Sequence, residues 1–340
     1  MTLTRIGSAA DDIANFLSAI LSEGGCAAVI CNTVRRAQSV YSRLRECDIV
    51  PPDDLILYHA RFPNGWRAEI EKRVLSRFGR DGARRPERAI VVATQVIEQS
   101  LDLDFDVMVT DPAPVDLLIQ RAGRMHRHDR PCRPTPLATA QLALAYPLLD
   151  ERGVPQWDAG DAYVYEPYIL LRTHLALDGR DRLRLPSDTQ ALIGAVYDDE
   201  EPGDLATAMA AALVDARSRS IRGDARATAE ARGRMVSAVC DERLLDHRSA
   251  LLKEDSPEAH DALRALTRLS PRGVTLVCLH AIGGGLMTDP DHGLSVDLDQ
   301  PPDDAVTRAL VAASLDVSSW PIVHHFVSQP TPTGWSASAT

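Results

Sequence analysis

Three arginines are spaced three residues apart in the segment QRAGRMHR, which covers residues 120–127. If the segment is helical, Arg121, Arg124 and Arg127 lie on nearly the same side of the helix and reach one cleft. Guanidinium groups stay charged and bind phosphate through two parallel hydrogen bonds, which suits a transferring phosphoryl group. The alternative is a solvated basic helix end that complements the helix dipole. Gln120 before the arginines and Gly123 between them favour the phosphate-binding interpretation.

A second candidate site precedes the arginines in the sequence. The apolar run that ends at Ala93 predicts a strand, and Thr94 and Gln95 follow directly. Parallel sheets bind ligands at the carboxyl ends of their strands, where a hydroxyl and an amide suit a nucleic-acid backbone. Asp102, further along, is a candidate acceptor for a ribose hydroxyl, although a simple loop carboxylate is the alternative.

The elements that position these residues alternate between strands and helices. Apolar spacing predicts strands over 27–31, 55–59, 89–93 and 107–110, and helices near 13–20, 34–44 and 66–78 and from Pro114 to about Arg127. Asn32 and Thr33 stand where a helix cap is expected. Strands that are apolar on both faces and separated by helices predict an α/β fold, a parallel sheet with helices on both faces.

The proline-rich stretch 134–160 divides the chain into two predicted domains, 1–133 and 161–340, with 134–160 as a linker. In the second domain we expect a strand over 162–165, helices over 167–177 and 187–196, and a long polar helix from 204 to about 236, loosened near Gly223. A strand over 274–280, a turn at 283–285 and a helix near 303–313 follow. This domain is predicted to be a smaller, mostly helical α+β unit.

Several segments resemble the motifs of superfamily 2 helicases. The segments ATQVIEQSLDLDFD (93–106) and LLIQRAGRMHRH (117–128) resemble motifs V and VI, with wording similar to the CRISPR-associated helicase-nuclease of type I interference systems. The segments CNTVRRAQ (31–38) and HARFP (59–63) are similar to that family's motif IV and its next motif. Weaker similarity continues through YEPYILLRT (165–173).

The resemblance implies that 1–133 is a RecA-like lobe, the second of a helicase motor, and that 161–340 is part of an accessory C-terminal domain that closes over DNA. Arg124 and Arg127 would be arginine fingers, and Gln120 and Arg121 would couple the two lobes. Residues implied to face single-stranded DNA, or assigned to it from their place in the motifs, are Thr33, Arg35, Arg61, Thr94 and Gln95. The family also implies recruitment by a guide-RNA surveillance complex and an HD-type nuclease domain that cuts the DNA.

The sequence departs from a complete motor in its nucleotide-binding motifs. It contains no GxxxxGK[ST] loop and no acidic motif to hold Mg²⁺. ATP and Mg²⁺ are therefore expected only when a first RecA-like lobe completes the site, and this chain alone is not expected to hydrolyse ATP. His–Asp and His–His pairs at 128–129, 246–247, 291–292 and 324–325 lack further ligands in suitable positions, so no metal site is predicted.

The composition is that of an ordinary globular protein, with 340 residues, 45% hydrophobic, 25% charged and a net charge of −11. The acidity lies after residue 133, since residues 1–133 hold 19 basic and 18 acidic residues and the rest hold 18 and 30. No apolar run or leader suggests a membrane, so a cytoplasmic location is expected. Two alternatives stay open: a non-enzymatic DNA-binding or interaction module built on a helicase lobe, and half of another superfamily 2 helicase.

Overall fold

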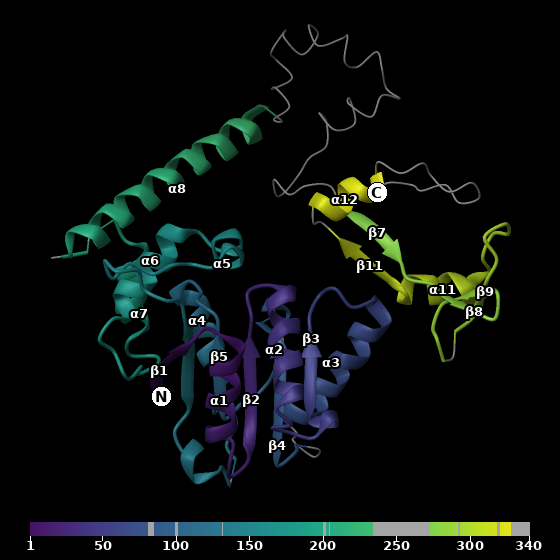
Figure 1. Cartoon of the computed structure of the whole chain (residues 1–340), viewed down its shortest axis with the longest axis horizontal. Coiled ribbons are helices and arrows are strands. Elements are labelled where there is room, and N and C mark those ends of the chain that lie inside the picture. The colour runs from purple at the N-terminus through teal and green to yellow at the C-terminus, as the bar shows by residue number, and fades with distance from the viewer. Residues whose placement is uncertain are drawn as a thin grey trace, which may run out of the picture.

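The computed structural model describes residues 1–80, 85–98, 101–130, 132–199, 202–203, 205–233, 273–291, 293–317 and 320–327. A six-stranded sheet occupies the first part, in the order β1-β6-β5-β2-β4-β3 (Figure 1). Its strands are Thr2–Gly7 (β1), Gly25–Ile30 (β2), Leu55–Tyr58 (β3), Arg88–Ala93 (β4), Val107–Thr110 (β5) and Gln141–Tyr146 (β6). All pairings in this sheet are parallel, which confirms the predicted sheet type.

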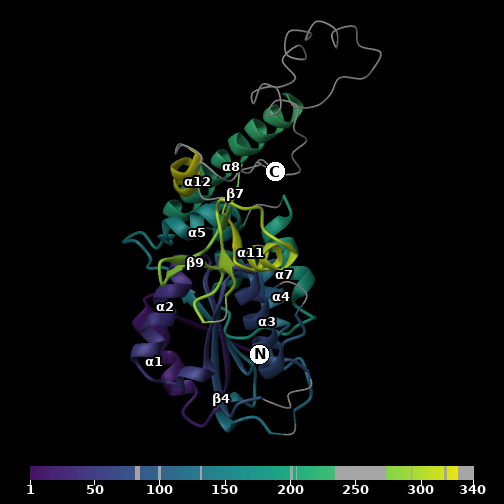
Figure 2. The same ribbon diagram turned by 90° about the vertical axis from the view of Figure 1, so that its right-hand side faces the viewer.

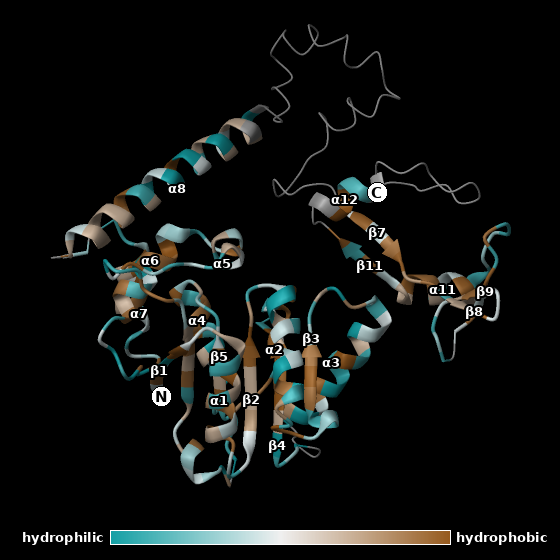
Figure 3. Ribbon diagram, viewed as in Figure 1, coloured by the Kyte–Doolittle hydropathy of each residue, from teal (hydrophilic) through white to brown (hydrophobic). Residues whose placement is uncertain are grey.

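Helices cover both faces of the sheet, which Figure 2 shows edge-on. On one face, α1 (Ala10–Ile20) and α2 (Val34–Glu46) pack against alternate strand residues such as Ala27 and Val29. On the other face, α3 (Asn64–Phe78) and α4 (Val115–Ala122) pack against the intervening residues such as Ala28 and Ile30. Both clusters are apolar, as the hydropathy colours of Figure 3 indicate for the strands, and their burial from water stabilises the layered fold.

The segment 134–160, which the sequence predicts as a linker, contains the sheet strand β6. Strand β6 pairs with β1, which the sequence analysis also missed, and residues 142–145 are buried. The prolines of this segment lie outside the ladder, where they cost no sheet hydrogen bond. The RecA-like unit therefore extends at least to Tyr146 rather than ending at residue 133.

Helices after β6 also join this core rather than a separate domain. They are α5 (Ala159–Val164), α6 (Pro167–Leu177) and α7 (Thr189–Tyr197), and Leu177, Leu192 and Val196 belong to the same apolar cluster as α3 and α4. The strand predicted over 162–165 is wrong, since α5 occupies it; the Asp158 side chain caps that helix by accepting from the Gly160 N–H. Helices α6 and α7 lie where the sequence predicts them.

Helix α8 (Thr207–Gly233) runs uninterrupted past Gly223, against the prediction of a break there. Its first turns pack on α6 through Met209 and Leu213, and the remainder extends away from the sheet (Figure 1). A single glycine in a helix costs only about 1 kcal/mol relative to alanine, too little to stop a long alanine-rich helix.

A smaller region follows the long helix. Its described strands are Val274–Val277 (β7), His280–Ile282 (β8), Gly285–Met287 (β9), Ser295–Val296 (β10) and Ser314–Val317 (β11), and its helices are Asp304–Ala312 (α11) and Trp320–Val327 (α12). The strands form two small antiparallel sheets, β10-β9-β8 and β11-β7. The predicted 283–285 turn is confirmed as the β8–β9 hairpin, where Gly283 and Gly284 have positive φ.

This smaller region contacts the sheet domain at the start of α3. Asn64 donates to the Ser314 hydroxyl at 3.1 Å, and the Trp66 indole N–H donates to Asp289 at 3.3 Å. Trp66 also stacks on His280, with ring centroids 6.4 Å apart. The indole is 44% exposed, so it contributes to an interface rather than to the core.

Candidate functional site

Helix α4 ends at Ala122, with Gly123 as its cap, so Arg121, Arg124 and Arg127 do not share a helical face. The expectation of one helix running to about Arg127 is therefore wrong. Beyond Gly123 the backbone pairs with Phe105: the Phe105 N–H donates to the carbonyl oxygen of Arg124 at 2.9 Å, and the His126 N–H donates to that of Phe105 at 3.1 Å. These bonds replace the helical ones, and the three arginines have three different environments.

Arg121 is fully buried and holds other motifs in place. Its guanidinium donates to Glu98 at 2.7 Å and to the Tyr165 hydroxyl at 3.0 Å, and it also contacts Thr110 at the end of β5. A buried guanidinium requires such partners, because an unpaired buried charge is costly. Arg121 therefore connects the loop after β4, strand β5 and the end of α5.

Arg124 is half-buried, and its side chain binds the backbone of the loop after β4. Its guanidinium donates to the carbonyl oxygens of Glu98 and Leu101, and its Nε has no hydrogen-bond partner among the described residues. Burial and the nearby charge of Arg127 lower the pKa of Arg124. An anion beside this arginine would relieve both effects, as a phosphate group does.

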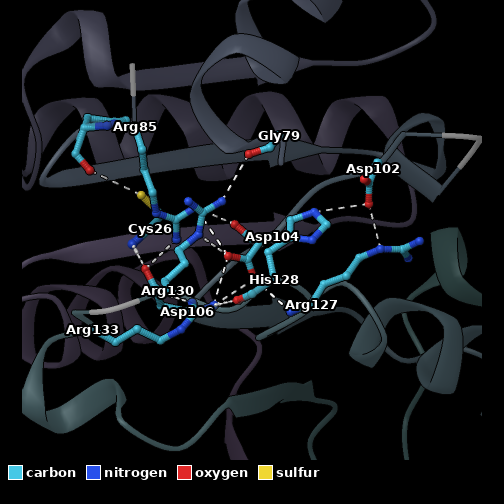
Figure 4. Close-up of polar contacts among 11 residues, drawn as sticks. Cys26, Gly79, Arg85, Asp102, Asp104, Asp106, Arg127, His128, Arg130 and Arg133 are labelled. Carbon is cyan, nitrogen blue, oxygen red and sulfur yellow. Dashed lines mark hydrogen bonds and ion pairs between the residues drawn. The ribbon is translucent and has the colours of Figure 1, made fainter. Parts of the chain in front are cut away.

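Arg127 and Asp102, both predicted to bind nucleotide, lie together. The Arg127 Nε is 2.7 Å from a carboxylate oxygen of Asp102, and both side chains are about half exposed, at 47% and 48%. The His128 ring lies 3.2 Å from the same oxygen (Figure 4). Gln120 is exposed one residue before the buried Arg121.

The predicted nucleic-acid residues occupy the carboxyl edge of the sheet. Thr94 is buried directly after β4, whereas Arg35 and Arg61 are exposed after β2 and β3. Thr33 is the N-cap of α2, as predicted, and its hydroxyl accepts from the Arg36 N–H at 3.3 Å. These residues thus lie on one edge of the sheet, after the carboxyl ends of β2, β3 and β4.

Gln95 belongs to a polar network that sequence reasoning missed. Its amide donates to the Asn32 carbonyl oxygen at 3.1 Å and to the Tyr165 hydroxyl at 3.3 Å. The Asn32 side chain donates in turn to Asp161 at 2.7 Å, and its N–H donates to Asp111 at 3.0 Å. Gln95 and Asn32 lie in the expected motifs, so their types gave a signal for a polar site. The contacts of Tyr165 and Asp161 depend on helix α5, in a segment whose end the sequence predicts as a strand.

A buried ionic cluster lies at the amino end of β5, where Asp104 and Asp106 are 0% and 3% exposed (Figure 4). Arg130 and Arg133 bind Asp104, and Arg85 binds Asp106 at 2.8 Å. Burial by itself would raise the pKa of Asp104, but the hydrogen bonds and charges of Arg130, Arg133 and Arg85 hold that pKa below its usual value. Arg85 is therefore part of this buried ion-pair cluster.

Among the described residues, no group of three or more His, Cys, Asp or Glu side chains is arranged to hold a metal ion. The pair 246–247 and His292 lie outside those residues. No helix in the same part of the chain is long and apolar enough to cross a membrane.

A parallel sheet covered on both faces, with an arginine-bearing segment bound to the loop after β4, defines a RecA-like helicase lobe. The family described as CRISPR-associated nuclease/helicase Cas3, C-terminal, matches residues 23–130. The CRISPR-associated endonuclease/helicase Cas3 of Thermus thermophilus is 39% identical over 292 residues, which cover 84% of this chain and 31% of that protein. The chain therefore corresponds to the C-terminal part of Cas3 helicases.

Solved structures agree with this assignment. A crystal structure of a CRISPR-associated protein is 42% identical, with a TM-score of 0.84, over 98% of this chain and 37% of that one. Cas3 of T. fusca with ATP is 30% identical, with a TM-score of 0.73, over 98% of this chain and 38% of that one. A chain of a pre-nicking CRISPR RNA-guided surveillance complex is 28% identical, with a TM-score of 0.70, over 98% and 39%. This chain thus spans about a third of the length of its T. thermophilus relative, at 31%.

Proposed function

We propose that this chain is the C-terminal part of an ATP-dependent translocase on single-stranded DNA that acts in type I CRISPR interference. The observation that carries the proposal is the half-exposed pair of Arg127 and Asp102 beside Arg124. A terminal phosphate group offers Arg127 charged acceptor oxygens like that of the carboxylate that it now contacts. Arg124 and Arg127 would then act as arginine fingers, and Asp102 would accept from the ribose.

The nucleotide and Mg²⁺ would be bound mainly by a first RecA-like lobe, whose phosphate-binding loop has no counterpart in this sequence. That lobe would face Arg124 and Arg127, either as another part of the same protein or as a partner chain. The relative of known structure with ATP supports the choice of nucleotide. The relative in a guide-RNA surveillance complex supports that complex as the recruiting partner.

Single-stranded DNA would cross the carboxyl edge of the sheet. Thr94, Gln95 and Thr33 would contact its backbone, and Arg35 and Arg61 are exposed cations suited to its phosphates. The loop that holds Thr94 and Gln95 continues to Glu98 and Leu101, which Arg124 binds. A single short loop thus connects the proposed DNA contacts with the proposed nucleotide contacts.

The test is ATPase activity with single-stranded DNA, for this chain alone and mixed with a separately expressed first lobe from the same genome. Activity only in the mixture is expected, and Arg127→Ala should lower its kcat by about 10³-fold or more. Arg152→Ala is the matched control, because Arg152 is 74% exposed and lies in a turn. Full activity of the Arg127→Ala mixture, or silence of a mixture whose first lobe binds ATP, would favour a non-enzymatic module instead.

A further inference from the structure

Tyr165 has a hydroxyl that accepts two hydrogen bonds from different motifs. Arg121, which belongs to residues 120–127 (the arginine segment), donates to it at 3.0 Å, and the Gln95 amide donates to it at 3.3 Å. The phenol follows the last residue of α5 and is only partly buried, with its ring packed on the apolar cluster under α4. The hydroxyl is therefore one of the points at which these two motifs meet.

The contacts beyond this hydroxyl reach both proposed sites. Arg121 also binds Glu98, whose carbonyl oxygen accepts from Arg124. Gln95 also donates to the carbonyl oxygen of Asn32, directly before the α2 cap at Thr33. The hydroxyl of Tyr165 is thus bonded directly to Gln95 on the DNA side. On the nucleotide side it is linked to Arg124 through Arg121 and Glu98.

We infer that Tyr165 is a positioning residue that couples DNA binding at Gln95 to the placement of Arg124 and Arg127. The inference rests on the proposed function for its consequence. The bridge itself, which is the pair of hydrogen bonds that join Gln95 and Arg121 through the Tyr165 hydroxyl, exists in the free chain. DNA that binds the Gln95 amide competes with the Tyr165 hydroxyl for the same donor. Arg121 donates to this hydroxyl as well, so loss of the Gln95 bond changes the surroundings of Arg121. A shift at the DNA contact therefore changes the restraint on the arginine segment.

The same helix ties down the neighbouring motif independently. Asp161, one turn before Tyr165, accepts from the Asn32 amide at 2.7 Å, and Asn32 donates its backbone N–H to Asp111 at 3.0 Å. Helix α5 is thereby fixed against the ends of β2 and β5. A fixed helix gives the Tyr165 hydroxyl a constant position, which a bridging role requires.

Tyr165→Phe removes the hydroxyl and keeps the ring, so the packing on the apolar cluster is retained. The matched control is Tyr163→Phe, because Tyr163 lies on the same helix and is 84% exposed. In the free chain, amide hydrogen exchange over 95–98 and 121–126 should rise roughly fivefold in Tyr165→Phe, while exchange in β1 and β6, away from the hydroxyl, stays as in the unchanged chain. Unchanged exchange over 95–98 and 121–126, or an equal rise in Tyr163→Phe, would overturn the bridge.

The consequence is measured in the mixture with the first lobe. Tyr165→Phe should lower the stimulation of ATPase by single-stranded DNA about tenfold and the basal ATPase rate by much less, with the DNA concentration at half-stimulation as in the unchanged chain. Equal loss of basal and stimulated rates would contradict a coupling role. A mixture without any DNA stimulation would refute the proposed function, and the exchange measurement would still decide on the bridge.

Discussion

The backbone N–H of Arg127 donates to a carboxylate oxygen of Asp104 at 2.9 Å. The proposed arginine finger is thus anchored through its main chain to the buried ionic cluster, while its side chain reaches Asp102. Arg130 and Arg133 neutralise Asp104 within the same cluster. The cluster therefore fixes the position of the segment that follows α4, where no helix holds it.

Replacement of this carboxylate should destabilise the fold. In Asp104→Asn, the cations around the site lose their counter-charge in a buried place, so the free energy of unfolding should fall by about 3 kcal/mol at pH 7. The measurement is urea unfolding, with the exposed Asp129→Asn as the control. Equal stability of Asp104→Asn and Asp129→Asn would show that the cluster adds nothing to the fold.

The pH dependence of that effect follows from the direction of the pKa shift. The folded pKa of Asp104 lies below its usual value, so its stabilising contribution is present above the unfolded pKa and is lost as the pH falls through the folded pKa. The stability gap between the wild type and Asp104→Asn should therefore narrow below about pH 4. A gap of constant size down to pH 2 would contradict the charge-based explanation.

Asp161 predicts the opposite pH dependence. Burial raises its pKa to about 6, so the folded state favours its protonated form. Its contribution to stability is then fully present below an unfolded pKa of about 3.9 and is lost as the pH rises through the folded value. Asp161→Asn, which still accepts from Asn32, should remove this loss, so its stability relative to wild type should increase from about pH 4 to 6. Asp158→Asn, at the exposed helix cap, is the control, and an equal trend in both variants would count against Asp161.

The contact between α3 and the smaller region should depend on Trp66. Trp66→Ala removes the stack on His280 and the hydrogen bond to Asp289, so amide exchange in α11 should accelerate by roughly threefold. Glu69→Ala is the control, because Glu69 is exposed on the same helix and pairs with Lys72. If exchange in α11 is equal in the two variants, Trp66 does not hold this interface.

The sequence predicted the central strands and the helices around them because their apolar spacing is regular. Strand β5 and helix α6 are examples, and the Thr33 cap of α2 had the expected polar residue at the expected place. Edge strand β1 and its partner β6 escaped, since β6 follows a proline-rich stretch and pairs with a strand far away in the sequence. Periodicity reports a local pattern and carries no information on which distant strand will pair.

At the candidate site, too, the sequence predicted the residue types but not the tertiary contacts. Motif residues such as Arg124 and Asp102 were found because their types and spacing are informative, but the helix assumed to carry the arginines ends at Ala122. Its end depends on backbone bonds to Phe105, a tertiary contact that propensity does not contain. The bridging role of Tyr165 likewise depends on α5 reaching the carboxyl edge of the sheet.

The proposed ribose contact of Asp102 can be separated from a mere hold on Arg127. If Asp102 accepts from a ribose hydroxyl, Asp102→Ala in the mixture with the first lobe should raise KM for ATP about tenfold and leave kcat within about twofold. The wild type should also prefer ATP over 2′,3′-dideoxy-ATP, and Asp102→Ala should lose that preference. If the carboxylate instead serves to orient Arg127, which lies 2.7 Å away, kcat should fall as it does in Arg127→Ala while the preference for the ribose hydroxyls stays. Kinetics with the two nucleotides therefore decide which partner the carboxylate serves, because only a direct contact distinguishes a substrate by its hydroxyl groups.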